Sequence, residues 1–369
     1  MRLLSFDSLS VSCSRTWKDI VCLSVWAEGV TRLMSTHSRI AVAVVLLLAF
    51  FMLIWQGERH GVTQDDAFIA FVYSKHLVTG NGLTFNPEER VEGYTNFLWV
   101  LIMAVPHLLG TDVPRFADLF ALTCALATIV VLFQWGRELH PERSPVLSLV
   151  APLLFAANGA VAFWTFSGME TALFTFLLTT GFVLYGRDLR CGSRNMLTAS
   201  VFGLAALTRP EGLLAFALTA VHSLALQRRL TLASLARLFR WTIPFFAFVL
   251  PHFAFRFAYY GELLPNTFYA KSAPRTIALQ YGMQYTWEFL ATCGLWGLVL
   301  LAPPVLLRRR QTRWVGFAAL VLWIYTGYVT IVGGDVLGAH RFFVPLLPLV
   351  YLVLQESIIA LVQNVTVPA

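Results

Sequence analysis

Two adjacent carboxylates, Asp65 and Asp66, directly follow the first long apolar run of a 369-residue chain that has only 20 acidic residues. A positioned carboxylate can take a proton from an attacking hydroxyl group or bind a divalent cation. Thr63 followed by Asp66 also resembles a capping box at the start of a helix. Because one acid satisfies a cap and successive helical residues point about 100° apart, we predict that Asp66 holds the turn. Asp65 would then face a cavity, as a base or as a metal ligand.

Two further segments place opposite charges beside turn residues. "LTRPEGLL" sets Arg209 and Glu211 at a break in one apolar stretch, and "GGDVLGAHRF" offers Asp335, His340 and Arg341 after two glycines. A tight hairpin explains the first segment in part, since Pro and Gly are ordinary turn residues. However, charged groups lie at membrane depth only where protein or a water-filled cavity surrounds them. We therefore predict that these side chains line a polar site.

A third segment, "YYGELLPNTFYAKS", contributes Asn266, Tyr269 and Lys271 as candidates for contacting a polar ligand. Its two leading tyrosines are equally well explained as aromatic residues at a membrane boundary. Lys271, Arg341 and Arg209 are cations that could hold a phosphate group, and the sequence does not rank them. The sequence contains no phosphate-binding loop, dinucleotide-binding fingerprint or metalloprotease motif.

These segments interrupt a strongly apolar chain. Hydrophobic residues make up 57% of the sequence, charged residues make up 13%, and the mean hydropathy is +0.68, whereas soluble domains are about 25% charged. Apolar runs near the ~17–25 residues needed to cross a bilayer recur throughout. The composition predicts an all-α polytopic membrane protein and excludes a soluble enzyme. The net charge of +7 comes from short basic clusters between the apolar runs, which is typical of orientation signals and not of nucleic-acid binding.

We predict about ten transmembrane helices. Their expected ranges are 40–55, 116–135, 146–163, 171–186, 197–208, 213–226, 241–258, 285–307, 314–332 and 342–362. The segment 97–110 is short for a span, contains Pro106, and offers Trp99 as an interfacial anchor, so we expect a helix lying flat in the membrane surface.

If the segment 97–110 lies in the membrane surface and does not cross, the main basic clusters fall on the same side as the basic N-terminal segment. Both chain ends are then in the cytoplasm. Six polar segments then share the outer face, towards the periplasm or the exterior: "TQDDAFIAF", "NPEERVEGYTN", "FSGMETALF", "LTRPEGLL", "YYGELLPNTFYAKS" and "GGDVLGAHRF". Loops that only connect helices have no reason to collect such residues on one face, so their convergence predicts a site.

The expected organisation is one membrane domain with short ends. An N-terminal tail covers 1–39, which a mis-assigned start would also explain. The transmembrane domain covers 40–362, with the first outer loop at 56–115, and a short C-terminal tail covers 363–369. The five scattered cysteines indicate neither a disulfide framework nor a zinc site.

The motifs together resemble a known family. "DDAFIAFVYSKHLVTGNGLTFNPEERVEGYTNFLW", "SGMETALF", "ALTRPEGLL", "YYGELLPNTFYAK" and "GGD…HRFFVPLLPL" follow one another over roughly 61–352. In this order they resemble the GT-C superfamily of membrane glycosyltransferases, and within it the mycobacterial terminal arabinofuranosyltransferases. The resemblance implies a polyprenyl-phosphate sugar donor, an acceptor glycan or lipid outside the cytoplasm, and an acidic motif at the catalytic centre, which Asp65 and Asp66 match.

The sequence therefore predicts a membrane transferase that moves a sugar from a polyprenyl phosphate to an acceptor hydroxyl. Asp65 is the expected base or metal ligand, with Asp66 second, and Lys271, Arg341 and Arg209 would stabilise the leaving phosphate. No cofactor is certain, and a divalent cation is possible. The alternatives are a transporter or flippase of lipid-linked glycans, in which internal repeats are common but are not seen here, and a non-catalytic scaffold subunit.

Overall fold

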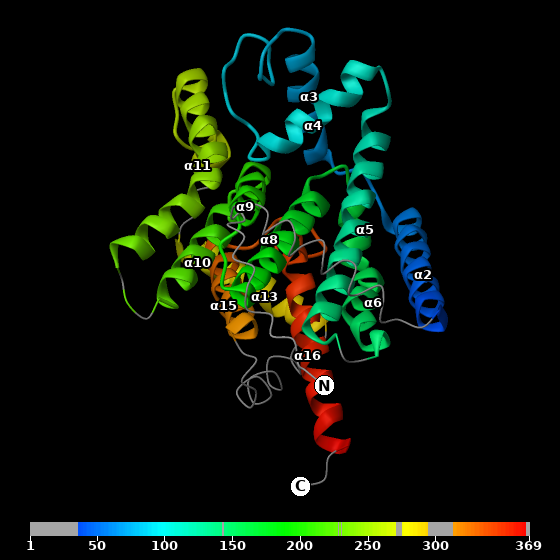
Figure 1. Ribbon diagram of the computed structural model, residues 1–369. Helices are drawn as coiled ribbons and strands as arrows, with labels where there is room; N and C mark the ends of the chain where they lie inside the picture. The colour runs from blue at the N-terminus through cyan, green and yellow to red at the C-terminus, as the bar shows by residue number, and fades with distance from the viewer. Residues whose placement is uncertain are drawn as a thin grey trace.

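The computed structural model describes residues 36–141, 144–227, 229, 231–270, 275–293 and 313–366, and within these ranges the secondary structure is helical (Figure 1). The elements are α2 (Thr36–His60), α3 (Asp65–Val78), α4 (Phe97–Leu109), α5 (Val113–Leu139), η1 (Pro145–Leu149), α6 (Val150–Ala157), α7 (Gly159–Thr165), α8 (Thr171–Cys191), α9 (Met196–Thr208), α10 (Glu211–Ala225), α11 (Leu232–Tyr260), α12 (Asn266–Ala270), α13 (Arg275–Thr292), α15 (Arg313–Val332), η2 (Val344–Leu346) and α16 (Leu347–Thr366). The predicted helical bundle is confirmed.

Four of the described helices are long and apolar enough to cross a membrane: α2, α5, α11 and α15. The segments Pro145–Ala157 and Gly159–Thr165 qualify together as a fifth span that bends by 60°. Shorter apolar helices cover Phe97–Leu109, Met196–Thr208, Glu211–Ala225 and Val344–Ala360. The chain is thus a membrane protein, while the expected count of about ten spans stays a prediction.

The span expected over 146–163 is not one continuous helix, because the chain breaks at Asn158. The Asn158 Oδ1 atom accepts hydrogen bonds from the backbone N–H groups of Ala160 (2.9 Å) and Val161 (3.3 Å). Its side-chain amide donates to the Tyr351 hydroxyl at 2.8 Å. An asparagine that satisfies the first free N–H groups starts a new helix, so the broken span follows from one polar residue inside an apolar run.

The break expected within 197–226 is confirmed. Helix α9 ends at Thr208, Arg209 is extended (φ −153°, ψ 144°), and α10 begins at Glu211. A residue before proline avoids the helical region, and proline itself is tolerated at the start of a helix. The sequence Arg209-Pro210 therefore ends one helix and positions the next.

Trp99 is not an interfacial anchor. Its side chain is fully buried, and its indole N–H donates to the Gly168 carbonyl at 3.2 Å. Burial is possible because the polar end of the ring finds a partner inside the protein. Helix α4 thereby packs inward through Trp99, Val100 and Met103, and its placement flat in a membrane surface stays a prediction.

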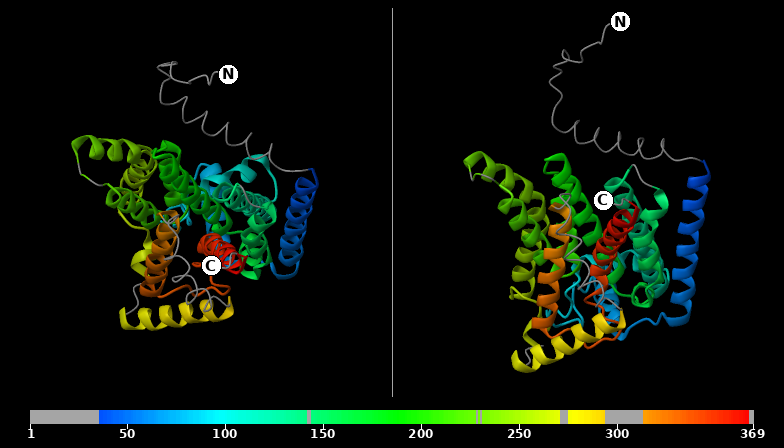
Figure 2. Two further views of the ribbon diagram at one scale, coloured as in Figure 1. Left: turned by 60° about the horizontal axis from the view of Figure 1, so that its bottom comes forward. Right: turned by 90° about the horizontal axis from the view of Figure 1, so that it is seen from below.

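Helix α13 begins ten residues before the span expected over 285–307, and 294–312 lie outside the described residues. In the right view of Figure 2, α13 lies crosswise to α2 and α15, at one end of the bundle. Gly282 allows its close approach to α15, because a Cβ atom there would clash with the Thr330 carbonyl. Helix α13 is thus held next to the segment that carries Asp335 and Arg341.

Candidate active site

A buried ion network joins the break between α9 and α10 to the turn before α8. The Arg209 guanidinium pairs with Glu170 at 2.7 Å and with Glu211 at 3.1 Å, and all three side chains are buried. The Asn96 amide donates to the other Glu170 oxygen at 2.8 Å. Every charge in this group therefore has a partner, as a buried charge requires.

A second arginine, Arg341, lies beside the first. It forms an ion pair with Asp335 at 2.6 Å and donates a hydrogen bond to the Met169 sulfur at 3.4 Å. The Phe342 ring lies 5.0 Å from the Arg209 guanidinium carbon and 5.6 Å from that of Arg341. Two buried arginines thus face three carboxylates, so both positive charges are already paired without an added anion.

The network sets the ionisation of its members. Burial by itself would raise the pKa of Glu170, but Arg209, Arg341 and hydrogen bonds outweigh it and lower that pKa below its ordinary value. Burial would likewise lower the pKa of Arg209, but Glu211 and Glu170 raise it. Both groups are therefore charged at neutral pH and act as a fixed ion pair.

The turn Ser167–Glu170 connects this network to the start of α3. The backbone N–H of Gln64, the residue before the Asp pair, donates to the Ser167 carbonyl at 3.0 Å. Gly168 has φ +74°, and a Cβ atom there would lie 3.0 Å from Ala67 and 3.1 Å from Thr63. Only glycine fits this conformation and this space, so the turn fixes where α3 begins.

Gly168→Ala should therefore displace the first turn of α3. We expect a cost of about 1–3 kcal/mol, from a left-handed non-glycine residue and from overpacking, together with a loss of any activity that depends on the position of Asp65. The thermal unfolding midpoint and the activity would be measured side by side. The matched control is Gly192→Ala, where φ is +64° and a Cβ atom would meet nothing within 4 Å. Equal effects of the two variants would contradict a role for the close contact.

Asp65 and Asp66 occupy the first two positions of α3, and both are exposed. The capping box expected at Thr63 is wrong, because Gln64 is the N-cap residue and its side chain makes no capping bond. Asp66 is accordingly not needed to hold the turn. Within the described part of the chain, neither carboxylate has a hydrogen-bond or ion-pair partner.

A second buried pair anchors the first outer loop to α11. Arg256 pairs with Glu92 at 2.6 Å, and both are buried. Burial raises the pKa of Glu92, although Arg256 opposes that rise. The backbone N–H of Asn266 donates to the Glu92 carbonyl at 3.0 Å, which brings the "YYGELLPN" segment to the same place.

The remaining expected site residues differ in their surroundings. The Asn266 side chain is exposed, and Tyr269 is exposed with its hydroxyl 3.3 Å from Glu262. Lys271 lies outside the described residues. His340 is half-buried with φ +50°, and burial lowers its pKa. Its neighbour Ala339 accepts a hydrogen bond from Trp164 at 2.9 Å, so this loop is held by the bundle.

The predicted convergence of the six polar segments is confirmed, because each contacts another through an interaction described above. The turn Ser167–Glu170 is the centre of these contacts, and sequence reasoning noted its motif without selecting Glu170. It also missed Asn96, Glu92 and Arg256. Glu170 could have been found in the sequence, because it is an acid directly before the apolar helix α8. Asp65 was chosen for a similar reason.

The sequence of this chain was compared with those of known proteins. No family model matches the chain. It is 30% identical over 266 residues to the terminal beta-(1->2)-arabinofuranosyltransferase of Mycobacterium tuberculosis, covering 68% of this chain and 41% of that protein. It is 28% identical over 357 residues to the Corynebacterium glutamicum protein of the same name, covering 84% of this chain and 50% of that protein. The chain is related to the terminal arabinofuranosyltransferases. It spans about half the length of these two relatives.

The fold agrees with this relationship. ArnT from Cupriavidus metallidurans, in a crystal structure with bound undecaprenyl phosphate, superimposes with a TM-score of 0.58 at 15% identity, over 86% of this chain and 59% of ArnT. The expected GT-C-like helical bundle is thereby confirmed.

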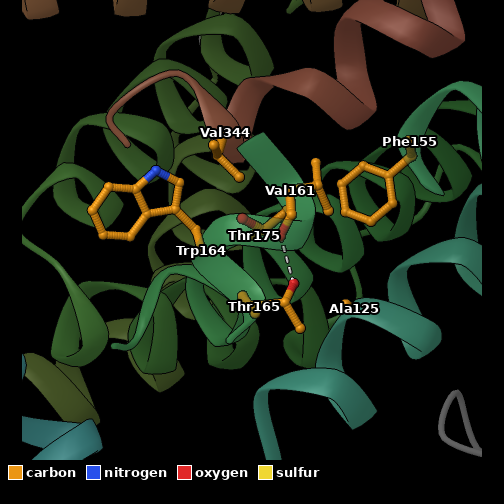
Figure 3. A pocket seen from close by; sticks show the side chains of 8 residues that line it. Ala125, Phe155, Val161, Trp164, Thr165, Thr175 and Val344 are labelled. Atoms are coloured by element: carbon orange, nitrogen blue, oxygen red, sulfur yellow. Dashed lines mark hydrogen bonds between the residues drawn. The ribbon is translucent and has the colours of Figure 1, made fainter. Parts of the chain in front are cut away.

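A small apolar cavity lies behind the network in this arabinofuranosyltransferase-like bundle. Its volume is about 10 Å³, and Phe155, Val161, Trp164 and Val344 are among its lining residues (Figure 3). Thr165 faces it with a hydroxyl that already donates to the Val161 carbonyl at 2.7 Å. A space of this size holds at most about one water molecule, so it is a packing gap and no substrate site.

Metal ligands are sparse in the described part of the chain, where no three of His, Cys, Asp and Glu lie close enough to hold an ion. Asp65 and Asp66 supply two carboxylates, and a cation there would need further oxygen ligands from substrate or water. The suggestion that Asp65 binds a metal stays a prediction.

Proposed function

We propose that this chain carries the membrane-embedded part of a glycosyltransferase that moves a sugar from a polyprenyl phosphate to a hydroxyl group of an acceptor glycan or lipid. The observation that carries the proposal is an exposed carboxylate pair at a helix N-terminus that has no partner among the described residues. A buried ion network holds the turn against which this helix starts. The kinship with terminal arabinofuranosyltransferases makes an arabinofuranosyl group the first sugar to test.

Asp65 is the proposed general base. It takes the proton of the acceptor hydroxyl as that oxygen forms a bond to the anomeric carbon, while the bond from that carbon to the phosphate oxygen breaks. The phosphate leaves with the bonding electron pair on the polyprenyl phosphate. Asp65 suits this role because no residue in the described part of the chain pairs with its carboxylate, whereas Glu170, Glu211 and Asp335 are in ion pairs. Asp66, one position further along α3, is the second candidate.

Arg209 and Arg341 are better placed to hold loops than to bind the leaving phosphate. Each is buried and already paired with carboxylates, and a phosphate would have to displace one of them at a large desolvation cost. Lys271, the third cation expected to stabilise the phosphate, lies outside the described residues. It stays a candidate for that role.

The membrane explains why the site lies among loops at one end of the bundle. A donor with an isoprenoid tail diffuses in the plane of the bilayer, so its phosphate stays at headgroup height. The basic clusters favour an outward position for these loops, which puts the acceptor on the extracytoplasmic side.

The direct test is sugar transfer from radiolabelled polyprenyl-phosphate donors by the purified protein in nanodiscs, with an extract of candidate acceptors. We expect label to move to an acceptor with at least one donor, beginning with the arabinofuranosyl form. Lipid translocation without sugar transfer would instead support a transporter.

The same assay shows whether sugar transfer needs a divalent cation. Asp65 acting as a base predicts that transfer persists after treatment with a chelator. Loss of transfer that Mg²⁺ or Mn²⁺ restores would show that Asp65 works through a bound cation.

A further inference from the structure

The first part of α11 forms an arm at the other end of the bundle from α13. In Figure 1, α11 runs as two limbs that meet at an angle, and it contains Pro244 and Pro251. Proline inside a helix removes a backbone hydrogen bond and bends the axis. The arm, residues 232–243, can therefore follow a different direction from the rest of α11.

One face of the arm is fixed to the protein. Ser234, Trp241 and, further along, Phe245 are buried. The Trp241 indole N–H donates to the Asn195 carbonyl at 3.0 Å, which ties the arm to the loop between α8 and α9. The Phe245 ring stacks on Phe216 with centroids 3.7 Å apart. The arm is thus a rigid part of the fold.

A second face of the arm is apolar and exposed. Leu232 is 85% exposed, Phe239 is 68% exposed, and Leu235 and Ile243 are also exposed. These positions recur every three or four residues, so they share one side of the helix. This strip fits the hydrocarbon side of a membrane surface.

The third face is basic and lacks neutralising acids. Arg237 and Arg240 are exposed, and Arg229 is exposed just before the arm. Among the described residues, none of the three has an ion-pair partner. The nearby acids are engaged elsewhere, since Glu138 pairs with Arg187, and Asp188 accepts from the Asn195 N–H and the Thr198 hydroxyl.

Another arginine reaches this basic face from the loop between α8 and α9. Arg194 is half-buried and donates to the Ser223 carbonyl at 3.4 Å. Burial lowers its pKa and the like charge of Arg237 adds to this, while Tyr185 and Asp188 act in the opposite direction. Two arginines from different elements thus repel each other, and an anion between or above them would relieve that repulsion.

We propose that the arm is a binding surface for anionic phospholipid: Arg237, Arg240, Arg194 and Arg229 bind headgroup phosphates, and the strip of Leu232, Leu235 and Phe239 enters the acyl layer. A lipid fits better than a soluble acidic partner because it supplies both an anion and an apolar chain beside it. Basic amphipathic helices bind membranes through this combination. In Figure 1 the first limb of α11 and the start of α3 lie in different parts of the fold, and the proposal does not depend on the reaction proposed at Asp65.

The test titrates phosphatidylglycerol or phosphatidylcholine into the detergent-solubilised full chain and takes an apparent affinity from the rise of the thermal unfolding midpoint. We expect tighter binding of phosphatidylglycerol, and a preference that fades as salt is added. Arg237→Gln/Arg240→Gln should weaken phosphatidylglycerol binding by roughly fivefold per arginine. It should leave phosphatidylcholine binding unchanged. Phe239→Ser should weaken both lipids alike.

Arg115→Gln is the matched control, because Arg115 is an exposed arginine at the start of α5, away from the arm. An equal loss of affinity in this control would overturn the proposal. So would wild-type affinity in the double arginine variant, or no salt dependence in the wild type. If soluble polyaspartate raised the unfolding midpoint as much as phosphatidylglycerol does, the surface would bind an acidic protein instead of a lipid.

Discussion

Asp65→Asn should reduce sugar transfer by about 10²–10⁴-fold, the usual contribution of a general base. Asparagine keeps the size and position of the side chain but cannot accept the proton of the acceptor hydroxyl. Because the Asp65 carboxylate is exposed and has no described partner, stability should change little. The rate of transfer and the thermal unfolding midpoint would be measured on the same nanodisc preparation, with the donor that the wild type uses.

Asp66→Asn is the matched control, since the two carboxylates share a helix turn, their exposure and their charge. We expect a clearly smaller loss for this variant. Normal transfer by Asp65→Asn would contradict the base assignment, and a larger loss in Asp66→Asn would move that role to Asp66. Unchanged binding of the donor lipid in both variants would show that the defect lies in the chemical step.

Arg209→Met should have the largest effect on stability. The substitution leaves Glu170 and Glu211 buried without the cation that now pairs with both at 2.7 and 3.1 Å. Breaking a buried ion pair in this way typically costs about 3–5 kcal/mol. We expect a much lower unfolding midpoint, and loss of activity because the turn Ser167–Glu170 no longer holds the start of α3. Arg209→Lys should recover part of the stability, since it keeps the charge but not the paired geometry.

The triple variant Arg209→Met/Glu170→Gln/Glu211→Gln separates charge from shape. Removing the two carboxylates together with the cation should restore much of the stability lost in Arg209→Met. A triple variant as unstable as Arg209→Met would show that the network acts by packing and not by charge pairing.

The pH dependence has a definite sign. In the wild type the pKa of Glu170 is lowered, so its contribution to stability is complete above the unfolded pKa of about 4.3. This contribution is lost as the pH falls through the folded value. In Arg209→Met the cation that opposes burial is gone, so burial should raise the Glu170 pKa. The deficit of the variant should therefore shrink as the pH falls from neutral towards ~5, and unfolding midpoints across that range would measure it.

Local patterns in the sequence determined several features that the structure confirms. The apolar composition determined a helical membrane bundle, because a bilayer leaves backbone groups few other ways to be satisfied. Arg209-Pro210 determined the break between α9 and α10 through the steric limits of proline. Charged and polar segments in an apolar chain also marked the six places that contact one another, since isolated charges are too costly to leave unpartnered.

The tertiary structure alone decided which of these groups meet. Glu170 pairs with Arg209 across 39 residues, Asn96 with Glu170 across 74, and Arg256 with Glu92 across 164. No local periodicity encodes such partners. The same packing buried Trp99, although tryptophan is a residue type common at membrane interfaces. It also paired Arg209 and Arg341 with carboxylates, although in the sequence both are candidates for binding a phosphate. Residue types thus fixed what chemistry was available, whereas long-range packing decided that Asp65 and Asp66 keep their charges exposed.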